Sequence, residues 1–476
     1  MKLRNRKAKI VATLGPACET EKAIEKLFLS GADVFRLNFS HGDHEDHKKK
    51  VKIIRNLEKK HDRYICILGD LQGPKFRVGR FLNVKEQLKK NQIFTFDQNK
   101  KDGDSSRVYL PHKEIFKSIA IGQRLLVNDG KVRLKVKSKS ASAIKCVVTD
   151  GGEISNNKGL NIPDTKLDLK IITPKDKKDL ELAIKLDVDW IALSFIQTTK
   201  DLLTAKKLIP AKFKVMVKVE KPSAMEEIET ITKNSDGIMV ARGDLGVHLP
   251  ISQVPAAQKF IISSCNKKGK EVITATQMLE SMTENPQPTR AESTDVHNAV
   301  LDGSDAIMLS GETSIGKYPN RAVEFMREIS SIAENDIDHI DLRSKRVSYL
   351  DSKNSNQIDE LIAHGAANIA EQLDAKLILA FTESGSTAAR VAAYRPSQPV
   401  IAISPDKHAG INLGLRWGVN TISVDSFDHI EKMFSYSEQL VQKENLASSG
   451  DTIVVVAGLP IGFKGNTNLI RVITIN

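Results

Sequence analysis

Short apolar runs alternate with stretches of helical period along most of this chain, and this alternation limits the folds open to it. We expect strands in the apolar runs at residues 9–15, 33–40, 64–70, 190–196, 214–220, within 235–247, 271–277 and 305–312. Helical stretches lie near residues 21–29, 43–60, 175–186, 201–209, 255–267 and 290–301, and another follows residue 319. Such alternation is typical of parallel βα units. Eight units close naturally into a (β/α)8 TIM barrel, although periodicity alone also permits an open doubly wound sheet.

The alternation is interrupted once, by a stretch of short β-branched runs and turns from about Gln72 to Asp168. Asn128-Asp129-Gly130 and Asp150-Gly151-Gly152 within it are typical of hairpins, so we predict an inserted small β-barrel domain. The expected domains are barrel at 1–71 and 169–343, insertion at 72–168, a polar linker at 344–356, and an open α/β domain at 357–476.

The net charge limits the possible functions only weakly, whereas the N-terminus and the distribution of apolar residues indicate the compartment. A net charge of +12 suits nucleic acid or small anionic substrates, and the Lys-rich runs, which lack interleaved aromatic residues, favour solvated helix faces over nucleic-acid binding. The N-terminus has no secretory signal and no window is apolar enough to span a membrane, so we expect a cytoplasmic protein. Without paired spacing, Cys18, Cys66, Cys146 and Cys265 are expected to be reduced packing residues.

Polar side chains stand near the ends of almost all the expected barrel strands. Parallel barrels carry their active sites at the carboxyl ends of the strands, so these residues are expected to meet. They are Arg36, Asn38, Ser40, Asp70, Ser194, Lys218, Glu220, Asp244, Thr276, Gln277, Ser310 and Glu312. An inward Lys218 needs an anionic partner, because burying an unpaired ammonium is costly.

The stretch SDGIMVARGDLGV, residues 235–247, reads as a buried strand followed by a tight turn. The backbone amides of that turn, at Gly243 and Asp244, are placed to bind an anion. Two carboxylates on adjacent strands, Glu220 and Asp244, suit one Mg²⁺ ion. Together with Arg36, Arg77 and Lys218, they predict a cavity for a small phosphorylated acid.

At this point the chain also resembles the pyruvate kinases along nearly its whole length. The motifs that carry the resemblance are KIVATLGPAC, FRLNFSHG, GDLQGPKFRVG, KGLNIP, MVKVEKP, DGIMVARGDLG, ATQMLESM and DAIMLSGETSIGKYP. They are long and specific, and their order and spacing also match. The resemblance implies transfer of a phosphoryl group from phosphoenolpyruvate to ADP, giving pyruvate and ATP in glycolysis, with Mg²⁺ or Mn²⁺ required.

The resemblance also implies a role for each site residue. Glu220 and Asp244 hold the metal; Gly243, Asp244 and Thr276 bind the substrate carboxylate. Lys218 touches the transferring phosphoryl group, Arg36 and Arg77 draw off its charge, and Ser194 is one of the substrate-binding residues. A path through Thr276, Ser310 and Glu312 supplies the proton. Arg242 is expected to support the turn or a subunit contact. The implied nucleotide residues are Asn38, His41, Arg77, Asp129 and Lys158, with the inserted domain closing as a lid.

One departure from many relatives concerns potassium. The family's potassium site corresponds to Asn38, Ser40, Asp70 and the Leu71 carbonyl, but Lys75 stands where those relatives have Glu, as in a bacterial type of pyruvate kinase. An ammonium there would repel the ion, so we predict that potassium is not required.

The C-terminal domain contains a candidate phosphate site, in which hydroxyls and amides precede an expected helix. Its residues are Thr382, Ser384, Gly385, Ser386 and Thr387, with residues 462–468 as a second wall. A helix cap is the simpler alternative. The resemblance favours a phosphorylated allosteric effector, and the Glu383 charge favours a monophosphate over a bisphosphate.

Two other functions remain open at this point. One is a metal-dependent phosphoenolpyruvate or 2-oxo acid lyase on the same barrel, for which a nucleotide lid would have no purpose. The other is a basic, non-catalytic nucleic-acid-binding protein, which would have no need of Lys218, Glu220, Asp244 and Thr276. The family resemblance implies phosphoenolpyruvate and ADP or ATP as partners, and a homotetramer.

Overall fold

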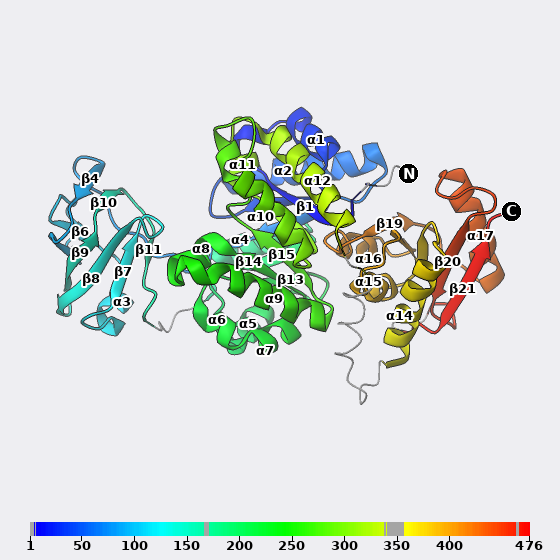
Figure 1. The fold of residues 1–476 in the computed structure, drawn as a ribbon. Coiled ribbons are helices and arrows are strands. Elements are labelled where there is room, and N and C mark those ends of the chain that lie inside the picture. The colour runs from blue at the N-terminus through cyan, green and yellow to red at the C-terminus, as the bar shows by residue number, and fades with distance from the viewer. Residues whose placement is uncertain (1–3, 5, 166–170, 338, 340–356, 463–465) are drawn as a thin grey trace.

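Eight parallel strands close into a barrel in the computed structural model, which describes residues 4, 6–165, 171–337, 339, 357–462 and 466–476 (Figure 1). Around the barrel the strands follow the order β1-β16-β15-β14-β13-β12-β3-β2. Their bounds are β1 (Lys9–Thr13), β2 (Val34–Asn38), β3 (Cys66–Asp70), β12 (Trp190–Leu193), β13 (Lys214–Val219), β14 (Gly237–Ala241), β15 (Glu271–Ala275) and β16 (Ala306–Leu309). Closure confirms the predicted barrel and rules out the open sheet.

Helices follow each strand and cover the outside of the barrel. They are α1 (Glu21–Ser30), α2 (His44–His61), α4 (Pro174–Lys185), α5 (Thr199–Lys206), α6 (Pro222–Glu226), α7 (Ile228–Asn234), α8 (Arg242–His248), α9 (Val254–Lys268), α10 (Arg290–Leu301), α11 (Gly311–Ser314) and α12 (Pro319–Asn335), with 3-10 turns at Pro16–Cys18, Ile251–Gln253 and Glu280–Thr283. Every residue of β1, β3, β14 and β15 is buried, as expected for strands covered on both faces. The helix expected after β3 comes only after the insertion, as α4.

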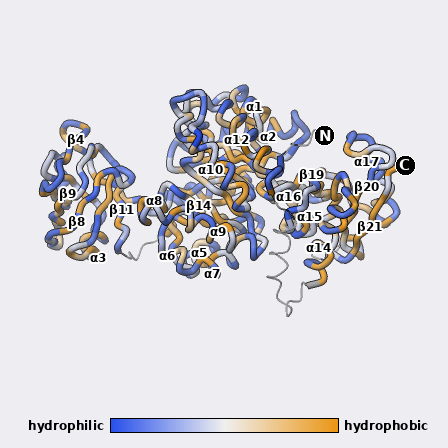
Figure 2. The backbone as a smooth tube through the Cα atoms, viewed as in Figure 1, coloured by the Kyte–Doolittle hydropathy of each residue, from blue (hydrophilic) through white to orange (hydrophobic). Residues whose placement is uncertain are grey.

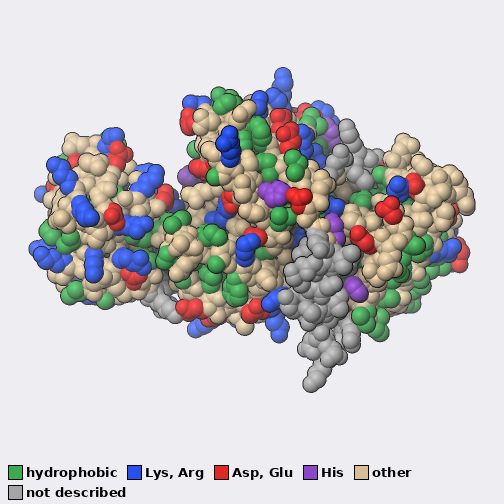
Figure 3. Space-filling model, viewed as in Figure 1, with side chains coloured by type: hydrophobic (Ala, Val, Ile, Leu, Met, Phe, Trp, Pro, Cys, Tyr) green, Lys and Arg blue, Asp and Glu red, His purple; other side chains and the backbone are tan. Residues whose placement is uncertain are grey.

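The inserted domain follows β3 in the chain and has its own apolar core. Its elements are β4 (Lys85–Leu88), β5 (Ile93–Asp97), β6 (Arg107–Tyr109), α3 (Lys113–Ser118), β7 (Arg124–Val127), β8 (Val132–Lys139), β9 (Ala143–Asp150), β10 (Gly152–Ser155) and β11 (Leu160–Asn161). Buried and exposed residues alternate along β8, and Figure 2 shows the matching change of hydropathy. Lys and Arg side chains are spread over the face of this domain seen in Figure 3.

The hydrogen-bonded ladders of the inserted domain differ from the predicted β-barrel. They form a six-stranded sheet, β11-β7-β8-β9-β5-β6, and a separate pair, β10-β4, rather than one closed ladder. The Asn128-Asp129-Gly130 hairpin is confirmed between β7 and β8. The predicted hairpin at Asp150-Gly151-Gly152 is wrong, because β10 pairs with β4 and not with the preceding strand β9. A Cβ on Gly151 would lie 2.5 Å from the Leu88 carbonyl oxygen, so the glycine permits this close crossing.

The C-terminal domain is an open five-stranded sheet in the order β19-β18-β17-β20-β21, in which β21 alone is antiparallel. Its elements are α14 (Gln357–Gln372), β17 (Ile378–Phe381), α15 (Ser386–Ala393), β18 (Val400–Ser404), α16 (Lys407–Asn412), β19 (Val419–Ser423), α17 (Ile430–Lys443), β20 (Thr452–Ala457) and β21 (Leu469–Thr474). The sequence patterns missed β19, whose buried face is short. The predicted linker at 344–356 and the predicted boundary at 168 lie outside the described residues.

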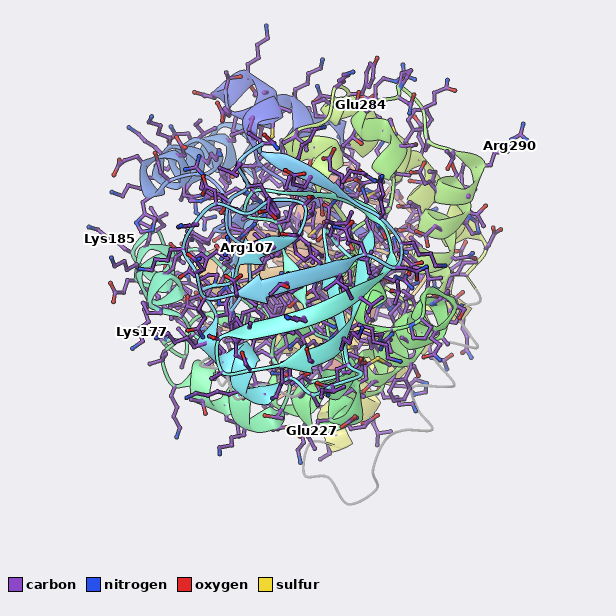
Figure 4. All side chains as sticks on the ribbon, turned by 90° about the vertical axis from the view of Figure 1, so that its left-hand side faces the viewer. Arg107, Lys177, Lys185, Glu227, Glu284 and Arg290 are labelled. Atoms are coloured by element: carbon purple, nitrogen blue, oxygen red, sulfur yellow. The ribbon has the colours of Figure 1, made fainter. Side chains whose placement is uncertain are left out.

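The two smaller domains lie at opposite ends of the barrel (Figure 1). The inserted domain follows the carboxyl end of β3. A Cβ built on its Gly130 would lie 3.7 Å from Val247 Cγ1 of α8. The C-terminal domain meets the amino ends of the strands, where Arg416 pairs with Glu271 at 2.8 Å and Arg395 with Asp305 at 3.1 Å. Figure 4 looks from the inserted-domain side, with Arg107 on that domain and Glu284 and Arg290 projecting around the barrel. The carboxyl ends are therefore left to the inserted domain.

The four cysteines are all free and buried, which confirms their predicted role as packing residues. Among the described residues, no helix combines the length and the apolar composition that crossing a membrane requires.

Candidate active site

Lys218 lies in β13 with its ammonium buried among acceptors at the carboxyl end of the barrel. Its Nζ lies 2.9 Å from Glu220 Oε1 and 3.3 Å from Asp70 Oδ1, and it donates to Ser194 Oγ at 2.8 Å. Burial opposes the charge, but Asp70 and Glu220 outweigh it and raise the pKa of Lys218 well above its usual range. The predicted need for anionic partners is confirmed, and the ammonium stays charged at any physiological pH.

Asp70, the last residue of β3, joins Lys218 to Arg36 of β2. The Arg36 guanidinium donates to Asp70 Oδ2 from Nε at 2.7 Å, and its Nη2 lies at the same distance from that oxygen. Burial disfavours the ionised carboxylate, but the charges of Lys218 and Arg36 more than offset this and lower the pKa of Asp70. Two cations therefore share one buried carboxylate, which fixes both at the mouth of the barrel.

Glu220 directly follows β13 and is held at both oxygens. Oε1 faces Lys218, and Oε2 accepts a hydrogen bond from the Phe195 amide at 2.7 Å. Burial raises the pKa of Glu220 to about 7; Lys218 opposes this shift and the charge of Asp244 adds to it. Asp244 is thus close enough for its charge to act on Glu220, as the predicted carboxylate pair requires.

The predicted tight turn at residues 242–246 is wrong, because these residues form the first turns of α8. The strand β14 ends at Ala241 and the helix begins at the next residue, so the chain turns through helical rather than reverse-turn geometry. Gly243 and Asp244 still lie at a helix start, where backbone amides lack partners within the helix. The two predicted amides therefore lie at the start of a helix instead of in a tight turn.

Thr276 and Gly243 already bind each other in this structure. The Gly243 amide donates to Thr276 Oγ1 at 2.7 Å, and the Thr276 hydroxyl donates to the Ala275 carbonyl at 2.6 Å. A built Cβ on Gly243 would lie 3.3 Å from Thr276 Oγ1, so a side chain here would crowd the contact. The structure brings together two of the three groups predicted to hold a carboxylate.

Ser310 and Glu312 lie just beyond β16 and interact locally. Glu312 is fully buried and accepts from the amides of Ser310 at 2.7 Å and Leu279 at 3.1 Å. Burial raises its pKa, although these amides oppose the shift. Ser310 Oγ is buried without a hydrogen-bond partner among the described residues. No hydrogen bond joins either residue to the Thr276 side chain in the described part of the chain.

The residues predicted to meet the nucleotide surround the junction of barrel and inserted domain. Arg77 donates to the Asn157 carbonyl at 2.9 Å, and a Cβ on Gly159, next to Lys158, would lie 3.3 Å from Lys75 Cε and 4.0 Å from Asp129 Oδ1. Burial lowers the pKa of His41, and the charges of Arg77, Lys75 and Arg36 lower it further. Arg77 thus lies near His41, while no described contact joins it to Lys218.

Three of the four residues predicted for a monovalent cation already have protein partners. Asn38 Oδ1 accepts from the Ser40 amide at 3.1 Å, and the Leu71 carbonyl accepts from Ser194 Oγ at 2.8 Å. Asp70 is paired with Arg36 and Lys218 as described above.

Two residues of this site were missed in the sequence. Thr13, at the end of β1, accepts from Arg36 Nη1 at 3.1 Å and donates to the Leu309 carbonyl at 2.8 Å. Its position at a strand end was the same signal that identified the others. Phe195 holds Glu220 through its amide and has a φ of 59°, which no side-chain pattern reveals.

Comparisons with known proteins agree with this geometry. A family model described as pyruvate kinase, barrel domain, matches residues 5–323, and one described as pyruvate kinase, alpha/beta domain, matches residues 360–473. The chain belongs to the pyruvate kinase family.

Relatives match almost end to end. A pyruvate kinase of Agrobacterium vitis is 44% identical over 469 residues, covering 98% of each chain, and one of Methylorubrum extorquens is 42% identical, covering 98% of this chain and 97% of its own. A crystal structure of a pyruvate kinase from Cryptosporidium parvum superposes with a TM-score of 0.93 at 37% identity, covering 99% of this chain and 97% of the other. Like its family, this pyruvate kinase is a phosphotransferase, which excludes both alternative functions.

The charges of this pyruvate kinase site leave room for a cation. Of the three carboxylates here, Asp70 and Glu220 pair with Arg36 and Lys218, whereas Asp244 makes no ion pair in the described part of the chain. Burial raises the pKa of Glu220, and the negative charge of Asp244 raises it further. Oxygen donors with an excess of negative charge suit a hard divalent ion.

We predict that Glu220 titrates near neutral pH in this pyruvate kinase when a chelator removes divalent ions. Carbon-13 NMR of labelled glutamate carboxyls should show one resonance with a midpoint of about 7, absent from Glu220→Gln. Because folding raises this pKa, the contribution of Glu220 to the free energy of unfolding falls as pH rises towards 7 and is constant above it. Asp244→Asn should lower the midpoint, since it removes a like charge. A midpoint at the ordinary glutamate value would contradict the burial argument.

Proposed function

We propose that phosphoryl transfer from phosphoenolpyruvate to ADP takes place at the carboxyl end of the barrel, with Lys218 at the reacting centre. The observation that carries this proposal is the buried ammonium, fixed by Asp70, Glu220 and Ser194 before any substrate binds. Phosphoryl transfer needs positioning and neutralisation of charge more than covalent chemistry. A preorganised cation in a buried site supplies both.

Each residue around Lys218 then has a role. Lys218 touches the transferring phosphoryl group and stabilises the enolate that develops as it leaves. Ser194 orients the Lys218 ammonium, whose hydrogen bond it accepts. Arg36, which donates to Asp70, draws off further charge, and Arg77 reaches the phosphoryl group when the inserted domain closes. Gly243, Asp244 and Thr276 bind the substrate carboxylate, which must replace the present bond between Gly243 and Thr276.

Glu220 and Asp244 would hold Mg²⁺ or Mn²⁺, as the excess of carboxylates supports. When bound, the ion supplies positive charge that stabilises an oxyanion. For the protonation of enolpyruvate we propose Thr276 as donor, with a water chain towards Ser310 and Glu312. The unpartnered Ser310 hydroxyl and the raised pKa of Glu312 support that path.

The nucleotide would lie between the barrel and the inserted domain. His41 and Asn38 on the barrel, and Arg77, Asp129 and Lys158 on the inserted domain, form the two walls of this position. Closure of that domain would exclude water during transfer.

We predict that Lys218→Met lowers kcat by about 10²–10³-fold, the usual cost of removing a preorganised charge. A coupled assay of ADP-dependent pyruvate formation measures this change. Lys214→Met is the matched control, because Lys214 lies at the opposite end of the same strand, near Asp236, and should retain activity. Equal rates in the wild type and Lys218→Met would remove Lys218 from the mechanism.

We also propose that Lys75 replaces the potassium requirement found in other members of the family. The charge of Lys75 acts on His41, which follows Ser40 of the predicted cation site in the chain, and this supports the proposal. Three of the predicted cation residues already bind other groups of the protein: Asn38 binds the Ser40 amide, Leu71 binds Ser194, and Asp70 pairs with Arg36. A fixed ammonium would supply the missing charge from within the chain.

Activity should persist when sodium or tetramethylammonium is the only monovalent cation. Lys75→Glu should make the rate depend on added potassium, because it restores a carboxylate and removes the ammonium. Lys117→Glu is the control, because Lys117 is exposed on the inserted domain. Lys175→Glu is unsuitable, because Lys175 donates to the Phe39 carbonyl. A collapse of the wild-type rate without potassium would refute this proposal.

A pocket in the C-terminal domain supports an effector site. Its lining includes the polar residues Thr382, Glu383, Ser386 and Thr387 and the aromatic residues Phe381 and Phe427. Gly385 donates to Thr382 Oγ1 at 3.0 Å, and Ser384 Oγ lies 3.1 Å from Ser386 Oγ. Residues 463–465 of the predicted second wall lie outside the described residues. The hydroxyls suit one phosphate, and the aromatic residues suit a ring beside it.

We predict activation by a sugar or nucleoside monophosphate in preference to a sugar bisphosphate, because Glu383 repels added negative charge. Titration of the activity with both kinds of ligand compares their half-saturating concentrations. Glu383→Gln should lower the half-saturating concentration of the bisphosphate and so reduce the difference between the two ligands. Activation by a bisphosphate alone would contradict the prediction.

We further propose, from the family, a homotetramer in the cytoplasm. Light scattering after size exclusion measures the assembly.

A further inference from the structure

Two consecutive residues after β15 hold a backbone conformation that their side chains disfavour. Thr276 has a φ of 68° and Gln277 a φ of 53°, in the left-handed region. A β-branched residue such as threonine rarely adopts it. Such backbone persists only where surrounding contacts impose it. The Thr276 hydroxyl therefore owes its position to whatever holds this pair.

Arg242, the first residue of α8, supplies those contacts. Its Nη2 donates to the Thr276 carbonyl at 2.8 Å and to the Gln277 carbonyl at 2.9 Å, and its Nε donates to the Thr276 carbonyl at 3.2 Å. One guanidinium thus grips the carbonyls of both strained residues. The planar fork of arginine permits this, whereas a lysine ammonium has no such geometry.

Asp295 fixes the guanidinium from the other side. Its Oδ1 accepts from Arg242 Nη1 at 2.7 Å, and Gln258 of α9 adds a weaker contact at 3.4 Å. Asp295 belongs to α10 and is absent from the predicted site. The Arg242 side chain is only 9% exposed, so little water competes for its donors.

We propose that Asp295 and Arg242 are a positioning pair that holds the Thr276–Gln277 turn against the start of α8 for phosphoenolpyruvate binding. Arg242 precedes Gly243 and Asp244 in the chain, so the same residue ties the helix start to the turn across from it. Loss of the pair releases the turn and moves the Thr276 hydroxyl away from Gly243. This proposal rests on the proposed binding of the substrate carboxylate by Thr276 and Gly243.

The test is Asp295→Ala in the full-length enzyme, with KM measured separately for the two substrates. We expect KM for phosphoenolpyruvate to rise about tenfold, equal to about 1.4 kcal/mol, with KM for ADP nearly unchanged. Arg242→Lys, which keeps the charge and loses the fork, should show the same selective rise. Thr294→Ala is the matched control, because Thr294 precedes Asp295 in α10, is exposed, and donates its hydroxyl to the Arg290 carbonyl of its own helix.

A double-mutant cycle with Thr276→Ala separates positioning from general loss of structure. If the pair acts through Thr276, Asp295→Ala has little further effect on KM for phosphoenolpyruvate in the Thr276→Ala background. Additive effects, or equal rises in KM for both substrates together with a lower Tm, would overturn the proposal. An unchanged KM in Thr276→Ala itself would refute the carboxylate site. An effect of Thr276→Ala without one of Asp295→Ala would refute only the positioning pair.

Discussion

The active site depends on one buried ammonium placed between two carboxylates. Neither Lys218 nor its partners could be buried alone, because removing one member of such a network leaves an uncompensated charge. Asp70 and Glu220 come from β3 and β13, and Ser194 follows β12, which lies between them. The network therefore links three neighbouring strands across the mouth of the barrel. The charges that we propose to neutralise the substrate also hold the strand ends together.

This arrangement explains how the domains divide the barrel. The inserted domain begins right after Asp70, so the chain that would carry a moving lid starts from a fixed, buried anchor. The C-terminal domain pairs Arg416 and Arg395 with Glu271 and Asp305, at the amino ends of β15 and β16. Those two strands carry Thr276 and Ser310 at their other ends. Contacts to the C-terminal domain thus stay away from the reacting centre while supporting the strands that reach it.

Sequence patterns could predict the parts of this structure that depend on polarity and period. Eight apolar runs gave the barrel, and an inward Lys218 required the carboxylates found beside it. Backbone geometry lay beyond those patterns: the start of α8 was taken for a tight turn, and Gly151 for a hairpin. Glycine permits both a turn and a close crossing of strands, so its presence alone does not decide between them. The left-handed Thr276 and the distant Asp295 depend on tertiary contacts that leave no local signal.

Several polar groups of the proposed site bind one another, and this affects how a substrate can enter. The Gly243 amide is bound to Thr276, and Glu220 uses both oxygens on Lys218 and Phe195. An anion that enters exchanges these bonds for its own, so only the difference between them contributes to affinity. A neutral ligand would break them without replacing their charge. The bonds that the protein already makes with itself at the proposed site therefore favour a charged substrate over a neutral one.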